Sequence, residues 1–183
     1  EVDSVVRRAA EMIENGEVEE SKIAKSVLVI DEAQDMGQDD FRLVQAWRKR
    51  NAEMRIIAVG DDDQNIYAFR GSNSDYFKSL ISDYGARFYE MTDNYRSDSS
   101  IVGYANRYIC QLTNRMKRTP IVPISEEKGS VISYVDSTHF ALPEILTGTT
   151  AVLTVTNEQA LQVACQLEQQ GKHGKLVQAT DGF

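Results

Sequence analysis

VLVIDEAQD, residues 27–35, begins with an apolar run of strand length, VLVI. Two adjacent carboxylates, Asp31 and Glu32, follow the run directly. A second such run, RIIAV at residues 55–59, leads into the polar stretch GDDDQNIYAFRGS at residues 60–72. Buried parallel strands have this continuous apolar character, and open α/β sheets bind ligands outside the carboxyl ends of their strands. The sequence therefore predicts an α/β fold whose parallel sheet carries acidic groups at a ligand site.

The spacing of apolar residues divides the rest of the chain into alternating elements. Helices are predicted over residues 3–14, 38–51, 74–84, 98–116 and 158–170. Further strands are predicted over residues 87–91, 130–135, 151–155 and 175–179, and residues 119–129 read as a surface loop. This alternation is typical of a doubly wound parallel sheet with helices on both faces.

Two neighbouring acids at a strand end can divide the work of phosphoryl transfer. Asp31 is assigned to hold Mg²⁺, directly or through its water shell, and Glu32 to orient or deprotonate the attacking water. The alternative is that the two acids only cap a following helix. Their adjacency, beside Gln34 and Asp35, favours the catalytic interpretation.

The motif NYRS follows at residues 94–97, and with it the chain resembles the superfamily 1 DNA helicases of the UvrD/PcrA/Rep type. Residues 31–35 match the Walker B motif of that family, residues 60–72 its third helicase motif and residues 94–97 its fourth. The resemblance implies RecA-like P-loop NTPase domains, ATP and Mg²⁺ as cofactors, and single-stranded or duplex DNA as partner. It implies the carboxyl half of a first RecA-like domain at residues 1–92 and the amino half of a second at residues 93–183.

The resemblance also implies roles for residues around the nucleotide. Gln64 would sense the γ-phosphate, since an amide can bond to a phosphoryl oxygen, and a plain turn residue is the alternative. Tyr95 would stack on adenine. Arg96 would contact the γ-phosphate from across a domain cleft, in the manner of an arginine finger, and a surface ion pair is its alternative. Some of the three aspartates at residues 61–63 are expected to cap or brace their loop, and none is assigned to a metal.

Aromatic residues in the third motif indicate contact with DNA. Tyr67 and Phe69 are two residues apart, so in an extended segment both rings face the same way and can bracket nucleobases. Relatives of this type stack single-stranded DNA on these positions, and the alternative is that both rings are core. Arg70 either contacts a phosphate or pairs with a carboxylate.

A later segment, Thr156 and Asn157, matches a part of the family that lies near the DNA path. Val155 stands where the family commonly has an arginine, and this departure weakens the DNA assignment of both residues.

No GxxxxGK(S/T) loop occurs in the 183 residues, and GKHGK at residues 171–175 lacks that spacing and reads as a solvated turn. We therefore expect an internal excerpt of a larger helicase, acting in DNA repair or recombination, whose remaining chain supplies the phosphate loop. This chain alone is not expected to hydrolyse ATP. Two other classes of protein fit the same motifs: a non-catalytic helicase-like module that binds DNA or a partner, and the helicase part of a helicase-nuclease.

Composition places the chain among ordinary globular proteins, with 42% hydrophobic and 26% charged residues. No run approaches the roughly 20 apolar residues that cross a bilayer, so no membrane partner is expected. The two cysteines, Cys110 and Cys165, lack metal-binding spacing and are expected to be reduced, as in a cytoplasmic protein. His139 and His173 are expected at the surface. The formal net charge of −8 predicts weak DNA binding by the isolated chain.

Overall fold

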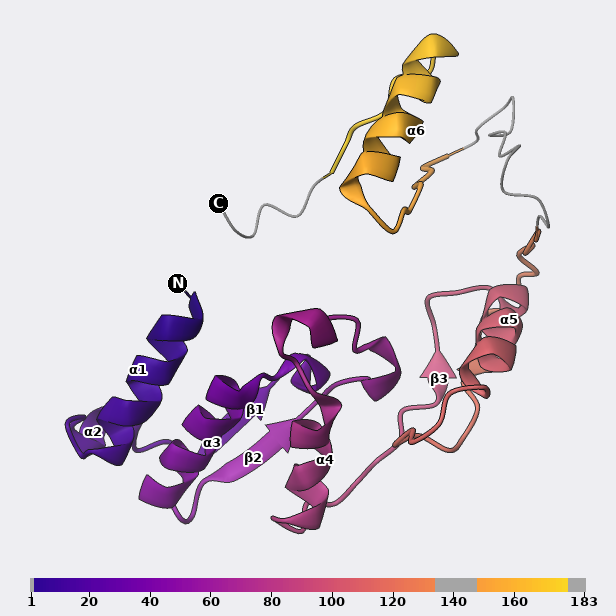
Figure 1. The fold of residues 1–183 in the computed structure, drawn as a ribbon. Coiled ribbons are helices and arrows are strands. Elements are labelled where there is room, and N and C mark those ends of the chain that lie inside the picture. The colour runs from indigo at the N-terminus through magenta and orange to yellow at the C-terminus, as the bar shows by residue number, and fades with distance from the viewer. Residues whose placement is uncertain (1, 134–147, 178–183) are drawn as a thin grey trace. The chain divides into compact units, whose positions relative to one another are not determined.

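The computed structural model describes residues 2–133 and 148–177, and the chain divides into two compact units, residues 1–132 and 133–183 (Figure 1). The first unit contains, in order, α1 (Val2–Glu14), α2 (Glu20–Ile23), β1 (Val27–Ile30), α3 (Gln38–Arg50), β2 (Arg55–Ala58), α4 (Ser74–Ser82), β3 (Asp93–Asn94), α5 (Ser99–Ile109) and β4 (Val122–Pro123). Three short 3-10 turns, η1 (Ala33–Asp35), η2 (Asp62–Gln64) and η3 (Ala68–Arg70), follow the first two strands. The second unit contains α6 (Asn157–Gln169) among its described residues.

The central sheet is a parallel pair, β1 and β2, in the register that sets Leu28 opposite Ile56. Side chains alternate between the two faces of the pair, and on one face Ile30 and Ala58 pack against a buried cluster. The cluster lies under helices α3 and α4, and its buried members are Ala33, Met36, Phe41 and Leu80. Phe41 stacks on Tyr76 of α4 with the ring centroids 5.0 Å apart. The mixed α/β character predicted from the apolar runs is therefore confirmed.

The opposite face of the same pair is exposed within the described residues. Its side chains, Val27, Val29, Ile57 and Val59, are between 46% and 62% exposed. Helices on both faces of a larger sheet were predicted, but α3 and α4 both pack on one face and the sheet has two strands. The described residues thus show an α/β arrangement on one face of a small sheet, and a larger sheet with helices on both faces stays a prediction.

Helix α1 packs on α3 through a second cluster, whose buried members are Ile13, Ile23 and Ala46. Trp47, partly buried beside this cluster, donates from its indole N–H to the carbonyl oxygen of Ile23 at 2.6 Å. Arg42 of α3 pairs with Glu14 of α1 at 2.6 Å on the rim. These contacts fix the start of the chain against the helix that follows β1.

The predicted elements near the strands are confirmed within a few residues, and the later ones depart from prediction. The helix predicted over residues 98–116 ends at Ile109, and Asn114 further along adopts a left-handed backbone, with φ of 63°, that does not continue a helix. Residues 87–91 form no strand, because a strand requires a neighbour and Tyr89 and Met91 are mostly exposed. A two-residue strand, β3, begins instead at Asp93.

The loop predicted over residues 119–129 contains β4, which pairs in parallel with β3. Asn106 of α5 holds this segment, since its side-chain amide donates to the carbonyl of Ile121 at 2.8 Å and accepts from the N–H of Ile121 at 3.1 Å. Such long-range anchoring leaves no periodic signal in the sequence.

In the second unit, residues 151–154 form no strand and α6 begins at Asn157 as predicted within one residue. The described parts of the other two predicted strands, residues 130–133 and 175–177, are not strands either, and their remaining residues lie outside the described chain. Gly171 after α6 has φ of 69°, in the turn predicted over residues 171–175. No helix in the described residues is long and apolar enough to cross a membrane.

Candidate functional site

The carboxyl ends of β1 and β2 bring the two predicted nucleotide motifs together. Because the strands are parallel and in register, Asp31 and Gly60 leave the sheet at the same edge. Both Asp31 and Glu32 are exposed there, and one oxygen of Asp31 accepts from the N–H of Glu32 at 3.0 Å. Asp31 thus keeps an accessible carboxylate oxygen of the kind that Mg²⁺ prefers.

Glu32 adopts a left-handed backbone, with φ of 50° and ψ of 44°, ahead of the η1 turn. A residue other than glycine pays about 1 kcal/mol or more for such a conformation, and these outliers concentrate at functional sites. The cost is offset locally, because the Glu32 carboxylate accepts from the Gln34 side-chain amide at 2.7 Å. Glu32 does not cap the α3 helix, whose N-cap is Gly37.

Gln34 joins the two strand ends, and its role was not predicted. It is 2% exposed, donates to Glu32, and accepts the backbone N–H of Asp61 on its side-chain oxygen at 2.9 Å. Its own carbonyl accepts from the Asn65 side chain at 2.7 Å. One buried amide therefore connects the Glu32 carboxylate to the loop that carries Gln64.

Gly60 is required where this loop crosses Gln34. A Cβ at position 60 would lie 2.5 Å from the Gln34 side-chain oxygen and 3.0 Å from the Ala33 backbone nitrogen. The close approach explains a glycine at the end of β2 without any need for a positive φ.

Gln64 is exposed at the end of η2 and donates from its side-chain amide to Asp61 at 2.7 Å. Burial acts to raise the pKa of the Asp61 carboxyl, but hydrogen bonds from Lys117 and Gln64 outweigh it and hold that pKa below its ordinary value. Asp61 also accepts the backbone N–H of Asp63 at 3.2 Å, which closes the turn. The predicted bracing role of the first aspartate is confirmed.

The other two aspartates of residues 61–63 bind a segment distant in sequence. Asp63 is 3% exposed and makes a two-pronged pair with Arg115, at 2.8 Å and 2.7 Å. Asp62 accepts the backbone N–H of Met116 at 2.7 Å. The hydrogen bonds that Arg115 donates to Asp63 raise the pKa of Arg115, although burial acts to lower it. The three carboxylates also lie close enough together to hold a cation. Arg115, Lys117 and the backbone N–H of Met116 already bind them.

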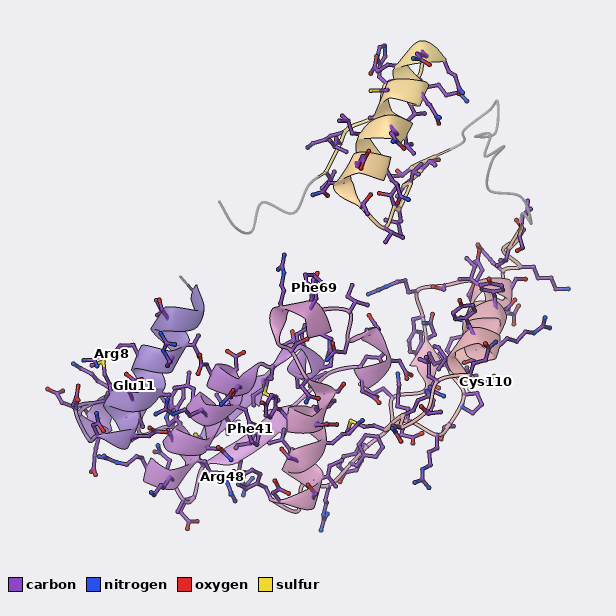
Figure 2. The ribbon with its side chains drawn as sticks, viewed as in Figure 1. Arg8, Glu11, Phe41, Arg48, Phe69 and Cys110 are labelled. Carbon is purple, nitrogen blue, oxygen red and sulfur yellow. The ribbon has the colours of Figure 1, made fainter. Side chains whose placement is uncertain are left out.

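Tyr67 and Phe69 form an exposed aromatic pair, 39% and 79% exposed, with centroids 6.1 Å apart. The predicted extended segment is wrong, because residues 68–70 form the η3 turn, yet the rings still lie together. The Arg70 guanidinium lies 5.3 Å from the Tyr67 centroid and 5.6 Å from that of Phe69. Phe69 lies at the outer rim of this segment (Figure 2), so the two rings are surface groups and not core.

The fourth motif lies just after β3 and presents its side chains outward. Tyr95 is 76% exposed and Arg96 is exposed. The Asn94 side-chain oxygen accepts the N–H groups of Arg96 and Ser97 at 3.1 Å and 2.8 Å, which fixes the turn. Within the described residues Arg96 makes no ion pair, so its guanidinium is available.

Thr156 and Asn157 lie in the second unit, where both are exposed. Thr156 is the N-cap of α6 and its hydroxyl accepts the N–H of Gln159 at 3.2 Å, while the Gln159 side chain accepts the N–H of Thr156 at 3.2 Å. This reciprocal capping box gives Thr156 a structural role.

Other candidates from the sequence lie apart from this site. Cys110 and Cys165 are free and exposed. His173 is exposed and lies 3.3 Å from Glu168, and His139 lies outside the described residues.

Comparison with known proteins relates this arrangement to DNA helicases. Residues 3–85 match the family described as the UvrD/REP helicase N-terminal domain. The chain is 39% identical over 93 residues to YjcD of Bacillus subtilis (strain 168), covering 50% of this chain and 12% of that protein. It is 29% identical over 89 residues to DNA helicase II of Haemophilus influenzae, covering 49% and 12%. It is 29% identical over 123 residues to DNA helicase IV of Escherichia coli (strain K12), covering 66% and 18%.

The chain thus spans less than a fifth of the length of these relatives. The matched segment contains β1, β2 and both polar loops that follow them. Residues 3–85 are accordingly similar to the N-terminal domain of the UvrD/REP helicase family.

Proposed function

We propose that this chain is part of an ATP-dependent DNA helicase that moves along single-stranded DNA and separates strands in repair or recombination. The observation that carries the proposal is the junction at the ends of β1 and β2. There the buried Gln34 links Glu32, after one strand, to Asp61 and Gln64, after the next. Parallel strand ends with acids and an amide on adjacent loops suit phosphoryl transfer.

In this proposal residues 1–92 belong to a first RecA-like domain and residues 93–183 to a second, with the phosphate loop supplied by other residues of a longer protein. Asp31, through its accessible carboxylate oxygen, would hold the magnesium ion that accompanies ATP. ATP supplies the phosphoryl group whose hydrolysis drives movement. Glu32 orients the attacking water, and its hydrogen bond from Gln34 fixes the carboxylate for that task.

Gln64 in this proposal bonds to the γ-phosphate, since one N–H of its exposed amide stays on Asp61 and the second N–H is left to donate to a phosphoryl oxygen. Arg96 contacts the same phosphate when the two RecA-like domains close, and Tyr95 stacks on the adenine. Both side chains are exposed and supported by the Asn94 turn, as groups that meet a ligand must be.

Single-stranded DNA would stack on Tyr67 and Phe69. Exposed rings on a turn offer faces to nucleobases, and stacking on such rings tolerates any base. Arg70, lying against both rings, can add a cation–π contact or reach a phosphate. We assign Thr156 and Asn157 only a secondary DNA contact, because the capping box already accounts for Thr156.

The test of this function is Glu32→Gln in the full-length protein that contains this chain. We expect ATP binding to change by less than about twofold and DNA-stimulated hydrolysis to fall by about a hundredfold or more, as for loss of a general base. Glu53→Gln, at an exposed glutamate just before β2, is the matched control and should retain wild-type turnover.

Two outcomes would overturn the proposal. Wild-type turnover in Glu32→Gln would remove the catalytic role of that residue. A wild-type protein that binds DNA but hydrolyses no ATP would instead identify a non-catalytic helicase-like module.

A further inference from the structure

Three consecutive aspartates are bound by three consecutive residues more than 50 positions later in the chain. Arg115 binds Asp63, the Met116 backbone N–H binds Asp62, and Lys117 binds Asp61 at 2.9 Å. We call residues 115–117 the basic clamp. The clamp exists because the chain turns at Asn114 and does not continue α5.

The clamp contacts are shielded from water. The side chains of Arg115 and Lys117 are 18% and 15% exposed, and those of Asp63 and Asp61 are 3% and 24% exposed. Ion pairs at the open surface contribute little, whereas a shielded pair holds its geometry, because separating it strands a charge away from water. The clamp is therefore a shielded contact and not an ion pair at the open surface.

One carboxylate connects the clamp to the predicted phosphate sensor. One oxygen of Asp61 binds Lys117, and the other accepts the side-chain amide of Gln64 at 2.7 Å. Gln64 is exposed, so this bond is what orients its side chain in the described structure. The Asp61 backbone N–H is bonded in turn to Gln34, which holds Glu32.

We propose that Lys117 is a positioning residue for Gln64: by fixing the Asp61 carboxylate, it presents the Gln64 amide to the γ-phosphate of a bound nucleoside triphosphate. The inference rests on the proposed function. It extends that function to a segment that no helicase motif of the chain contains. Through the clamp, residues 115–117, the state of the nucleotide at Gln64 would be passed to the chain beyond β3.

The experiment is a double-mutant cycle in the full-length protein, with DNA-stimulated ATP hydrolysis as the readout. Lys117→Met should lower kcat by about tenfold, as expected when a reacting group is misplaced by a fraction of an ångström, with KM for ATP changed by less than about twofold. In a Gln64→Ala background the same substitution should have no further effect on kcat, because Lys117 acts through Gln64. Lys117→Arg, which keeps the charge, should recover most of the activity.

Two controls separate positioning from folding. Lys128→Met, at an exposed lysine outside the clamp, should leave kcat unchanged. Thermal melting of each variant reports whether it folds. If Lys117→Met fails to fold, Asp61→Asn replaces it in the cycle, since it weakens the same pair while leaving the side-chain volume almost unchanged.

The outcomes are distinct from those for the proposed function. Equal loss of kcat from Lys117→Met with and without Gln64 would refute the positioning role, and so would wild-type kcat in Lys117→Met. Absence of ATP hydrolysis by the wild-type protein would refute the helicase proposal itself.

Discussion

Replacing Arg115 by methionine tests how much the clamp contributes to stability. Arg115 donates two hydrogen bonds to Asp63, at 2.8 Å and 2.7 Å, and Asp63 is 3% exposed. Methionine fills similar space but neither donates a hydrogen bond nor carries a charge. The substitution therefore leaves a carboxylate in a shielded position without its cation.

Removing one partner of a buried ion pair costs about 3–5 kcal/mol. Arg115 is 18% exposed, so water can partly replace it, and we expect a loss at the lower end, about 3 kcal/mol. Domains of this size are stable by about 5–15 kcal/mol, so the loss is a large share of the total. Arg115→Lys retains the charge but not the paired geometry and should cost about half as much.

Equilibrium unfolding of the 183-residue chain in urea, followed by the fluorescence of Trp47, measures these differences. Trp47 is the single tryptophan and is bonded to Ile23 in the described structure. Combining Arg115→Met with Asp63→Asn removes the stranded charge and should recover about half of the loss. A cost below about 1 kcal/mol for Arg115→Met, or no recovery in the double variant, would refute the shielded-pair argument.

Two further predictions concern the same loop. Gly60→Ala places a methyl group 2.5 Å from the Gln34 side-chain oxygen and should cost about 1–3 kcal/mol in the same unfolding assay, whereas Gly103→Ala, with open space around its Cβ, should be neutral or stabilising. The pKa of Asp61 is lowered by folding, so its contribution is complete above the unfolded value of about 4 and is lost as pH falls through the lower folded value. Asp61→Asn should therefore reduce the loss of unfolding free energy as the pH falls below about 4. Urea unfolding at a series of pH values measures this loss. If the dependence of the unfolding free energy on pH is unchanged in Asp61→Asn, the pair with Lys117 makes no contribution.

The elements around the site were predictable because their signals are local. The runs that became β1 and β2 are apolar throughout, and α3 and α4 show helical spacing with polar residues at their starts. Strands predicted at residues 87–91 and 151–155 did not form, since an apolar run is a strand only when a neighbour accepts its hydrogen bonds. A single sequence does not reveal whether that neighbour exists.

The residues of the candidate site were likewise predictable only where their signal is local in the sequence. Asp31 and Glu32 were recognisable because adjacent acids at a strand end are unusual. Gln34 gave no such signal, since its importance arises from burial at the crossing of two loops. The clamp was missed because the pattern favoured a helix through residue 116 and because the aspartates of residues 61–63 were expected only to cap or brace their own loop.

The net charge of −8 overstates the negative field that DNA would meet at this site. The three aspartates at residues 61–63, which precede the aromatic pair in the chain, are bound by Arg115, Lys117 and a backbone N–H, so most of their charge is balanced within the fold. The groups that face solvent beyond them are Tyr67, Phe69 and Arg70, two rings and one cation. Stacking contributes about 1–3 kcal/mol per base, more than a single screened phosphate contact. In the proposed function, attraction for single-stranded DNA at this surface would depend on exposed rings more than on charge, so a net negative chain is compatible with it.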